Sequence, residues 1–320
     1  MKILIIGGAG FLGYHLSKEY IGLGYSVDIN DNLSRGKLDQ DFKNLLISDK
    51  INFHNSDLNS FYDNQIYRND YDLIFHLAAK VGVANVQNNP YKTLYDNIDL
   101  TNIAVKIAKK QKSLKRIIFT STSEVYSGAV EISLAKIPTD EKTSFVINDI
   151  AEGRATYKLS KIVGESMLLN SSLPVSIVRP HNIYGPRMGM SHVIPELIFK
   201  ISKLKNGEKL AVYSVDHTRT FCYIEDAVNM MIDIAINKDT INKILNLGAE
   251  GPEVKMRELA KKIIILSDKS LNLRAEINHP GSPFRRCPDM SKTLKYINYE
   301  YKFDLDKGLR KTFDWYMKNI

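Results

Sequence analysis

The chain has 320 residues, of which 44% are hydrophobic and 25% are charged, and its net charge is +8. This composition is that of an ordinary globular protein and excludes a disordered chain. The basic residues are spread along the chain without a dense block interleaved with aromatics, so the charge does not predict a nucleic-acid partner. Cys222 and Cys287 fit neither a redox pair nor a zinc-ligand spacing, and we expect no metal site. These two cysteines suit a reducing cytoplasm, where we expect the protein to lie. No apolar run approaches the roughly 18 residues that span a membrane, so no membrane partner is expected.

Six short apolar runs recur along the first 180 residues and predict buried strands. They are KILIIG (2–7), YSVDIN (25–30), INFHNSD (51–57), DLIFHLAA (72–79), KRIIFTSTS (115–123) and VSIVRP (175–180). Their hydrophobicity is continuous, which is typical of strands covered on both faces in a parallel sheet. Segments 11–22, 94–111 and 151–170 have helical spacing and are predicted crossover helices. The predicted fold class is therefore α/β, with a Rossmann-type doubly wound parallel sheet.

The character of the chain changes after residue 180, where proline and glycine become frequent and a loop rich in proline and arginine follows at 279–289. The strand-like runs TFCYIEDA and ILNLG are interpreted as returns to the first lobe. We therefore expect residues 1–180, with about 220–248, to form the sheet domain. Residues 181–219 and 249–320 are predicted to form a smaller α/β lobe that binds the substrate.

GGAGFLG follows the first predicted strand at once and opens a helix, which gives Gly7, Gly10 and Gly13 a GxxGxxG spacing. Gly7 can make a tight turn, Gly10 can admit a pyrophosphate close to the backbone, and Gly13 can let helix and strand pack closely. The helix start at Phe11 and Leu12 then faces the anion with free N–H groups. Glycines in this position predict a dinucleotide-binding site.

Acidic residues after the second and third predicted strands are candidates for contacts to the adenosine. Asp31 lies about 20 residues beyond the glycines, where an acid accepts hydrogen bonds from the ribose, and Asn32 follows it. A carboxylate repels a 2′-phosphate, so NAD is favoured over NADP, although Arg35 nearby can accept that phosphate. Asp57, with Leu58 beside it, is placed to reach the adenine, and a solvated turn is its alternative role.

ATYKLSK places Tyr157 and Lys161 on one face of a predicted helix. Tyrosine is a poor base at its reference pKa of about 10, and a nearby ammonium lowers the pKa by favouring the phenolate. TSTSE, at the end of the fifth predicted strand, adds the hydroxyl of Thr122 and the carboxylate of Glu124. Following a dinucleotide cradle, these four residues are the leading candidates for proton transfer.

With these motifs, the sequence resembles the extended short-chain dehydrogenase/reductases that act on nucleotide sugars. GGAGFLG, DNLSRG, HLAA, TSTSEVY, YKLSK, RPHNIYGP, TRTFCYIEDA and RRCPDMSK stand in the family's order and spacing over nearly the whole chain. The resemblance implies an NAD-dependent enzyme that oxidises C4 of a nucleotide-diphosphate sugar, with a role in making surface-polysaccharide sugars. It also implies a homodimer formed through the helices predicted at 94–111 and 151–170.

The resemblance also assigns roles to single residues. Tyr157 would take the proton of the sugar 4-hydroxyl while hydride leaves C4 for NAD, Lys161 would hold the nicotinamide ribose, and Thr122 would share a hydrogen bond with the same hydroxyl. A non-catalytic NAD sensor is a remote alternative, and these three residues argue against it. Further contacts to the cofactor are expected from Ala78, Ala79 and Asn97. Contacts to the substrate are expected from Asn182, Arg187, Arg219, Arg285 and Arg286, because the fork of arginine suits phosphate oxygens.

Glu124 bears on the fate of the 4-keto sugar. An epimerase needs no further acid or base, whereas a 4,6-dehydratase needs both near C5 and C6. The pair Ser123-Glu124 resembles GDP-mannose dehydratases and UDP-glucuronate decarboxylases, yet the stretch 126–156, which includes Arg154, departs from the decarboxylase pattern. We expect C4 oxidation of the 4-dehydrogenase or 4,6-dehydratase type, with a 4-epimerase or a UDP-glucuronate decarboxylase-like enzyme as alternatives. Helix capping or pairing with a lysine is the structural alternative for Glu124.

Overall fold

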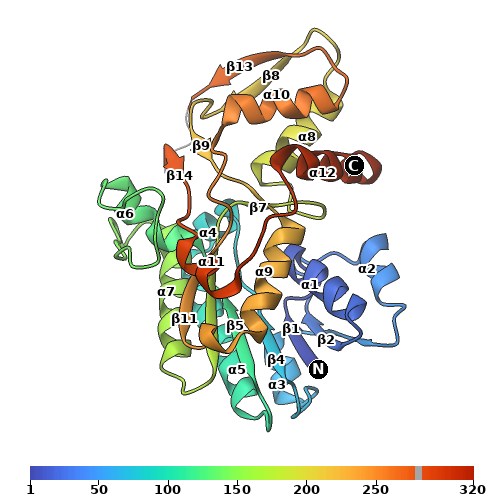
Figure 1. Cartoon of the computed structure of the whole chain (residues 1–320), viewed down its shortest axis with the longest axis vertical. Coiled ribbons are helices and arrows are strands. Elements are labelled where there is room, and N and C mark those ends of the chain that lie inside the picture. Colours follow the sequence, from blue (N-terminus) through green and yellow to red (C-terminus); the bar gives the residue numbers. More distant parts are fainter. Residues whose placement is uncertain (278–282) are drawn as a thin grey trace.

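One parallel sheet of seven strands lies at the centre of the computed structural model, which describes residues 1–277 and 283–320 (Figure 1). The strands lie in the order β11–β6–β5–β4–β1–β2–β3, and all neighbours are parallel. The strand order reverses between β1 and β4, and ligands of such sheets bind outside the carboxyl ends of the strands at that point. The Rossmann-type fold and its six predicted strands are confirmed. The strands are β1 (Lys2–Ile6), β2 (Ser26–Asp31), β3 (Ile51–Asn55), β4 (Leu73–His76), β5 (Arg116–Thr120), β6 (Val175–Pro180) and β11 (Lys243–Leu247).

Helices cover both faces of the sheet, which explains the continuous apolar runs. In β1, Ile3 and Ile5 belong to one apolar cluster, whereas Leu4 and Ile6 belong to another. Successive side chains of a strand point to opposite faces, so both faces of β1 are buried. The first cluster includes residues of α1 (Phe11–Gly22) and α9 (Ile224–Ile236), and the second includes residues of α3 (Leu58–Asp63), α5 (Pro90–Lys109) and α7 (Ala155–Leu169). Helices α5 and α7 pack on each other; the homodimer through them stays a prediction.

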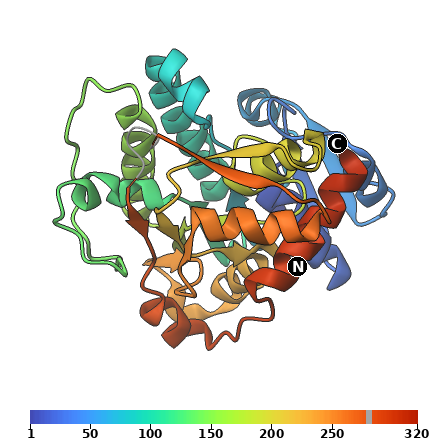
Figure 2. The same cartoon turned by 90° about the horizontal axis from the view of Figure 1, so that it is seen from above.

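The segments after β6 contribute a further group of elements, drawn above the sheet in Figure 1. Figure 2 looks down on this group and shows α10 in orange beside α12 in red. Its helices are α8 (Val193–Lys203), α10 (Met256–Leu266) and α12 (Leu305–Asn319). Its strands pair as β8 (Lys209–Tyr213) with β13 (Asn272–Glu276), and as β12 (Val254–Lys255), β9 (Thr218–Arg219) and β14 (Arg285–Arg286).

The remaining elements are short and connect the larger ones. They are α2 (Gln40–Leu45), α4 (Val83–Asn88), the 3₁₀ helix η1 (Ser123–Tyr126), α6 (Ser127–Glu131), β7 (Ile183–Tyr184), β10 (Cys222–Tyr223), the 3₁₀ helix η2 (Lys238–Thr240) and α11 (Ser291–Ile297). Among the described residues, no helix has the length and apolar character needed to cross a membrane.

The strand predicted from TFCYIEDA is wrong for most of its length. Strand β10 pairs with β7 outside the central sheet, and α9 begins at Ile224. Glu225 and Asp226 occupy the first turn of α9, where carboxylates favour a helix. ILNLG, by contrast, contributes β11 beside β6, as expected. The division into domains at residues 180, 219 and 248 stays a prediction, and residues 279–282 of the predicted loop lie outside the described residues.

A buried ion pair fixes α7 against β6. Arg179 donates from Nε and Nη2 to Glu165 at 2.9 and 2.6 Å, and neither side chain is more than 4% exposed. The guanidinium also stacks on Tyr126 and Phe145, 4.9 Å from each ring centre. Because Ser121 donates a further hydrogen bond to Glu165, the carboxylate is well satisfied despite its burial.

Replacing Arg179 by methionine is expected to lower the free energy of unfolding by about 3 kcal/mol, because Glu165 then lies buried without its partner. Urea unfolding measures this loss. The double variant Arg179→Met/Glu165→Leu removes both charges and should recover part of it. A single variant as stable as the wild type would contradict this account of the pair.

Candidate active site

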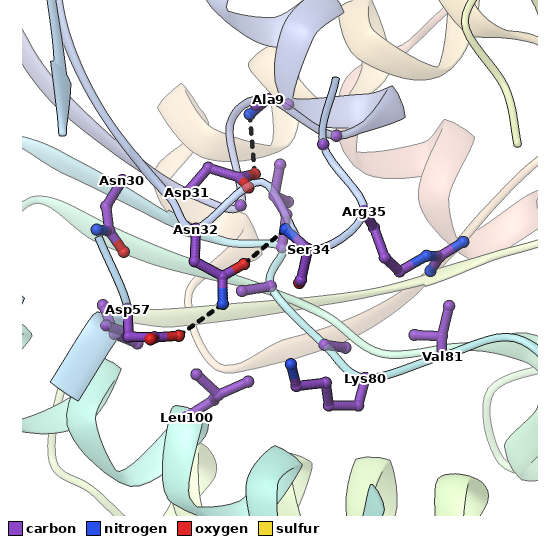
Figure 3. A pocket seen from close by; sticks show the side chains of 18 of the residues that line it. Ala9, Asn30, Asp31, Asn32, Ser34, Arg35, Asp57, Lys80, Val81 and Leu100 are labelled. Carbon is purple, nitrogen blue, oxygen red and sulfur yellow. Dashed lines mark hydrogen bonds between the residues drawn. The ribbon is translucent and has the colours of Figure 1, made fainter. Parts of the chain in front are cut away.

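A cavity of about 680 Å³ lies at the carboxyl ends of β1, β2, β3 and β4 (Figure 3). It therefore occupies the point where the strand order reverses. Three of the predicted cofactor residues, Asn97, Tyr157 and Lys161, do not line it. The predicted cofactor residues that do line it are Gly7, Gly10, Phe11, Leu12, Asp31, Asn32, Asp57, Leu58, Ala78 and Ala79.

The glycine turn between β1 and α1 forms one wall of the cavity. Gly7 has a φ of +86°, and a Cβ there would lie 2.7 Å from the backbone nitrogen of Ala78. A Cβ on Gly13 would lie 2.5 Å from the carbonyl oxygen of Gly7, so only glycine lets α1 approach the turn. No side chain caps α1 at Gly10, which leaves its first N–H groups available to a ligand. This cradle fits the pyrophosphate of a dinucleotide.

Asp31 stands at the end of β2 beside the glycine turn. Its carboxylate accepts hydrogen bonds from the backbone N–H groups of Ala9 at 3.0 Å and Leu33 at 2.8 Å. Burial raises the pKa of Asp31, while these two bonds lower it. Arg35, which could accept a 2′-phosphate, extends away from Asp31 in Figure 3. Its guanidinium therefore does not offset the negative charge of Asp31 at the ribose. The arrangement favours the unphosphorylated ribose of NAD.

Asn32 and Asp57 meet across the ends of β2 and β3. The Asn32 amide donates to the Asp57 carboxylate at 2.6 Å, and the Asn32 side-chain oxygen accepts from the backbone of Ser34. Figure 3 shows this pair at the edge of the cavity. Asp57 therefore has a defined side-chain partner in Asn32 and is more than a solvated turn residue.

Asn97 does not line the cavity itself, and its predicted contact to the cofactor stays a prediction. Its side chain accepts from the Lys80 backbone N–H at 2.6 Å and donates to the Lys80 carbonyl at 3.1 Å and to Ser160 at 3.1 Å. The residue is 3% exposed. It fixes the loop after β4 that lines the cavity.

Tyr157 of α7 and Thr122 after β5 come from separate elements, and they lie close enough for Thr122 to lower the pKa of Tyr157. Their predicted roles in proton transfer stay predictions. The pKa of Tyr157 is raised to about 12, because burial and then the charge of Glu124 raise it more than Thr122 and Arg35 lower it. The expected lowering of this pKa is therefore not found, because burial outweighs the favourable charges.

Lys161 is buried beneath Tyr157. Its ammonium donates to the carbonyl of Thr120 at 2.8 Å and lies 4.8 Å from the ring centre of Phe119 and 6.0 Å from that of Tyr157. Burial lowers the pKa of Lys161 to about 7, while the charge of Glu165 raises it. This ammonium is thus destabilised and is poised to gain from a hydroxyl or an anion that enters the site.

Glu124 has an arginine partner rather than the lysine considered from the sequence. Its carboxylate accepts from Nη2 of Arg286 at 2.8 Å, and the two side chains are 32% and 22% exposed. The charge of Arg286 holds the pKa of Glu124 below its usual range against the effect of burial, and the charges of Arg154 and Lys158 add to this. Glu124 is therefore ionised at neutral pH and cannot serve there as a proton donor.

The two neighbouring arginines of RRCPD have different partners. Strand β14 pairs with β9, which sets Arg286 beside Arg219 and Arg285 beside Thr218. Arg285 is tied to the carboxylate of Glu253 at 2.8 and 3.0 Å and is exposed. Arg219 donates to the carbonyls of Thr218 and Pro283, each at 2.7 Å. Burial, and then the charge of Arg286, lower the pKa of Arg219 to about 10. Arg219 and Arg286 thus form the arginine pair beside Glu124.

Arg187 lines the cavity, and its predicted contact to the substrate stays a prediction. It donates to Asp39 at 2.8 Å and to the Lys37 carbonyl at 3.0 Å, and it stacks on Tyr14 with 4.1 Å to the ring centre. Asn182, the other residue in this part of the chain, donates to the carbonyl of Thr220 at 3.0 Å.

Sequence reasoning missed Lys80 and Lys158. Lys80 follows Ala79 and lines the cavity, as Leu100 does (Figure 3). Lys158 follows Tyr157 and is 8% exposed. Lys158 could have been found from the sequence, because it is an ionisable residue next to Tyr157 in a helix that must be largely buried. In residues 1–277 and 283–320, no cluster of three or more His, Cys, Asp or Glu is placed to hold a metal ion.

Comparison with known proteins agrees with this geometry. Residues 3–248 match the model of the NAD dependent epimerase/dehydratase family. The chain belongs to this family. Its resemblance to the extended short-chain dehydrogenase/reductases is thereby confirmed, and so are NAD as the cofactor and the nucleotide-sugar chemistry of the group.

Two curated relatives and one solved structure show how far the similarity extends. The UDP-N-acetyl-alpha-D-glucosaminuronate decarboxylase of Bacillus cytotoxicus is 32% identical over 98% of this chain and 97% of its own. UDP-glucuronic acid decarboxylase 1 of Xenopus tropicalis is 30% identical over 100% of this chain and 73% of its own. The UDP-glucuronic acid 4-epimerase of Bacillus cereus, solved with UDP-glucuronic acid and NAD, shares the fold with a TM-score of 0.86 and 24% identity, covering 99% of each chain.

Substituting Gly13 by alanine is expected to weaken NAD binding about tenfold or more, because the added Cβ forces α1 away from the turn. Gly22 at the other end of α1 has nothing within 4 Å of a Cβ and provides the matched control, Gly22→Ala. Titration calorimetry with NAD compares the two variants. Equal affinities would show that the close approach of α1 does not shape the site.

Proposed function

We propose that this protein oxidises C4 of a UDP-linked uronate and then decarboxylates the resulting 4-keto acid. The observation that carries the proposal is the group of cations around Glu124, beside the tyrosine. Arg286, Arg154 and Lys158 all act on this one carboxylate. These three positive charges outnumber the single negative charge of Glu124. The surplus suits a sugar that carries a carboxylate of its own. Both curated relatives described above carry names of uronate decarboxylases.

In this mechanism, Tyr157 accepts the proton of the sugar 4-hydroxyl as hydride leaves C4. Bound NAD supplies reversible hydride acceptance at C4. Thr122 lies close enough to Tyr157 to lower its pKa, and its hydroxyl is offered to the same 4-hydroxyl of the sugar. Lys161 lies beneath the tyrosine ring, where its ammonium stabilises the phenolate once charge develops.

The ketone at C4 makes the sugar a β-keto acid, because the C6 carboxylate is attached to C5. The C5–C6 bond then breaks, carbon dioxide leaves and the electron pair moves to the C4 oxygen as an enolate. A proton added to C5 restores the ketone, and the returned hydride and the proton on Tyr157 restore the 4-hydroxyl. The net reaction consumes one proton and releases one carbon dioxide, with no net oxidation.

A 4,6-dehydratase is the second candidate, and the ionised state of Glu124 favours it. Dehydration requires a base that removes the proton of C5 from the 4-keto sugar. Glu124 is held ionised by Arg286 at 2.8 Å, which suits a base and does not suit an acid. A substrate of this type is a neutral hexose with a 6-hydroxyl.

The mass of the product decides between these candidates. The purified protein with NAD is incubated with UDP-glucuronate, its N-acetylglucosamine-derived uronate, UDP-glucose and UDP-N-acetylglucosamine. We expect a uronate to lose one carbon dioxide. Loss of one water from a neutral hexose would replace the proposal by the dehydratase, and an unchanged mass with inverted C4 would replace it by an epimerase.

Tyr157→Phe is expected to lower kcat about 10²- to 10⁴-fold, because it removes the group that exchanges the proton of the 4-hydroxyl. Substrate affinity should change much less, since the phenyl ring still fills the same space. Rapid-quench assays of carbon dioxide release measure this effect. Tyr126→Phe is the control for loss of a buried tyrosine hydroxyl, because this hydroxyl binds Asn246 and Arg179 and exchanges no proton in the proposed mechanism. Unchanged turnover in Tyr157→Phe would reject the proposed mechanism.

A further inference from the structure

Lys158 carries a charge that the fold does not pair. Its side chain is 8% exposed. No hydrogen bond or ion pair joins its ammonium to any described residue, yet the nitrogen is not among the fully enclosed polar atoms and so keeps contact with solvent. A lysine that buries its stem and keeps its ammonium in solvent without a bonded partner can pair with an anion of a ligand.

The position of Lys158 connects it with the proposed reaction. It follows Tyr157 directly in α7, and α7 packs against η1, which carries Glu124. Lys158 lies close enough to Glu124 for its charge to lower the pKa of that carboxylate, and Glu124 is already bound by Arg286 at 2.8 Å. Arg154 lies one helical turn before Lys158, on the same side of the chain segment. The ammonium of Lys158 is thus available to an incoming anion near the reacting sugar.

We propose that Lys158, supported by Arg154, binds the C6 carboxylate of the sugar and selects nucleotide-linked uronates over neutral hexoses. This inference rests on the proposed function, because it concerns the charge that the substrate of the same site carries. The diphosphate is common to both kinds of substrate and cannot provide this selection. A lysine beside the reacting end of the sugar can provide it, since a charge-assisted hydrogen bond forms with the uronate alone.

The arrangement also explains how two carboxylates can lie close together. Glu124 and the carboxylate of a uronate repel each other, and cations on both sides offset this repulsion. Arg286 holds Glu124 from β14, while Lys158 approaches from α7. A neutral hexose would leave Lys158 unpaired in the complex, which adds discrimination against it.

The test measures binding of UDP-glucuronate and UDP-glucose in the presence of NAD by titration calorimetry. All proteins carry Tyr157→Phe, so that no turnover interferes. Lys158→Met is expected to weaken UDP-glucuronate roughly tenfold or more and to change UDP-glucose less than about twofold. Lys158→Arg keeps the charge and should preserve most of the preference. Lys109→Met removes an exposed lysine of α5 and controls for the change of net charge.

Thermal unfolding separates this role from a structural one. The Lys158→Met protein should unfold at a temperature no lower than the parent, because the substitution removes a charge that has no bonded partner. The inference would be overturned if Lys158→Met lowered the unfolding temperature and weakened the binding of both ligands equally. Unchanged affinity of Lys158→Met for UDP-glucuronate would overturn it as well. If the parent protein itself shows no preference for UDP-glucuronate and releases no carbon dioxide, the proposed function fails as well. If the parent protein prefers UDP-glucuronate and Lys158→Met keeps this preference, only the role of Lys158 is rejected and the proposed function stands.

Discussion

All seven strands of the central sheet run in one direction, and the site depends on that constraint. Parallel strands end at the same edge, so residues far apart in sequence meet there. The glycine turn after β1, Asp31 at the end of β2 and Thr122 after β5 all lie at this edge of the sheet. Gly7 and Gly13 then allow α1 to start close to the turn, which aims its free N–H groups at the ligand. The fold therefore supplies the binding of the cofactor with backbone groups and leaves side chains for the chemistry.

Charges near the end of β5 differ in how well they are satisfied, and this difference marks where chemistry takes place. Glu165 and Arg179 satisfy each other and serve the structure. Lys161 has a single carbonyl acceptor and a pKa lowered by burial to about 7. Lys158 has no bonded partner at all among the described residues. Unsatisfied charges concentrate around Tyr157, where a ligand can satisfy them, and functional sites commonly break local rules of stability in this manner.

Local pattern was sufficient for the sheet and for the glycine cradle, because both depend on short runs of the sequence. The strand predicted from TFCYIEDA failed because only Cys222 and Tyr223 are extended before the acidic first turn of α9. Sequence could not separate Arg285 from Arg286, since their partners are set by the pairing of β14 with β9. The pKa of Tyr157 was also beyond reach, because it depends on burial by residues distant in the chain. Pairing register and burial are tertiary properties that no single segment encodes.

The central claim is that carbon dioxide is released only after oxidation at C4 by the site around Tyr157. The most direct test gives the NAD-loaded protein UDP-glucuronate or its 4-deoxy-4-fluoro analogue, which has no 4-hydroxyl to oxidise. The claim predicts carbon dioxide from UDP-glucuronate and none from the analogue, although the analogue binds. Release of carbon dioxide from the bound analogue would contradict the claim, because decarboxylation would then proceed without a ketone at C4.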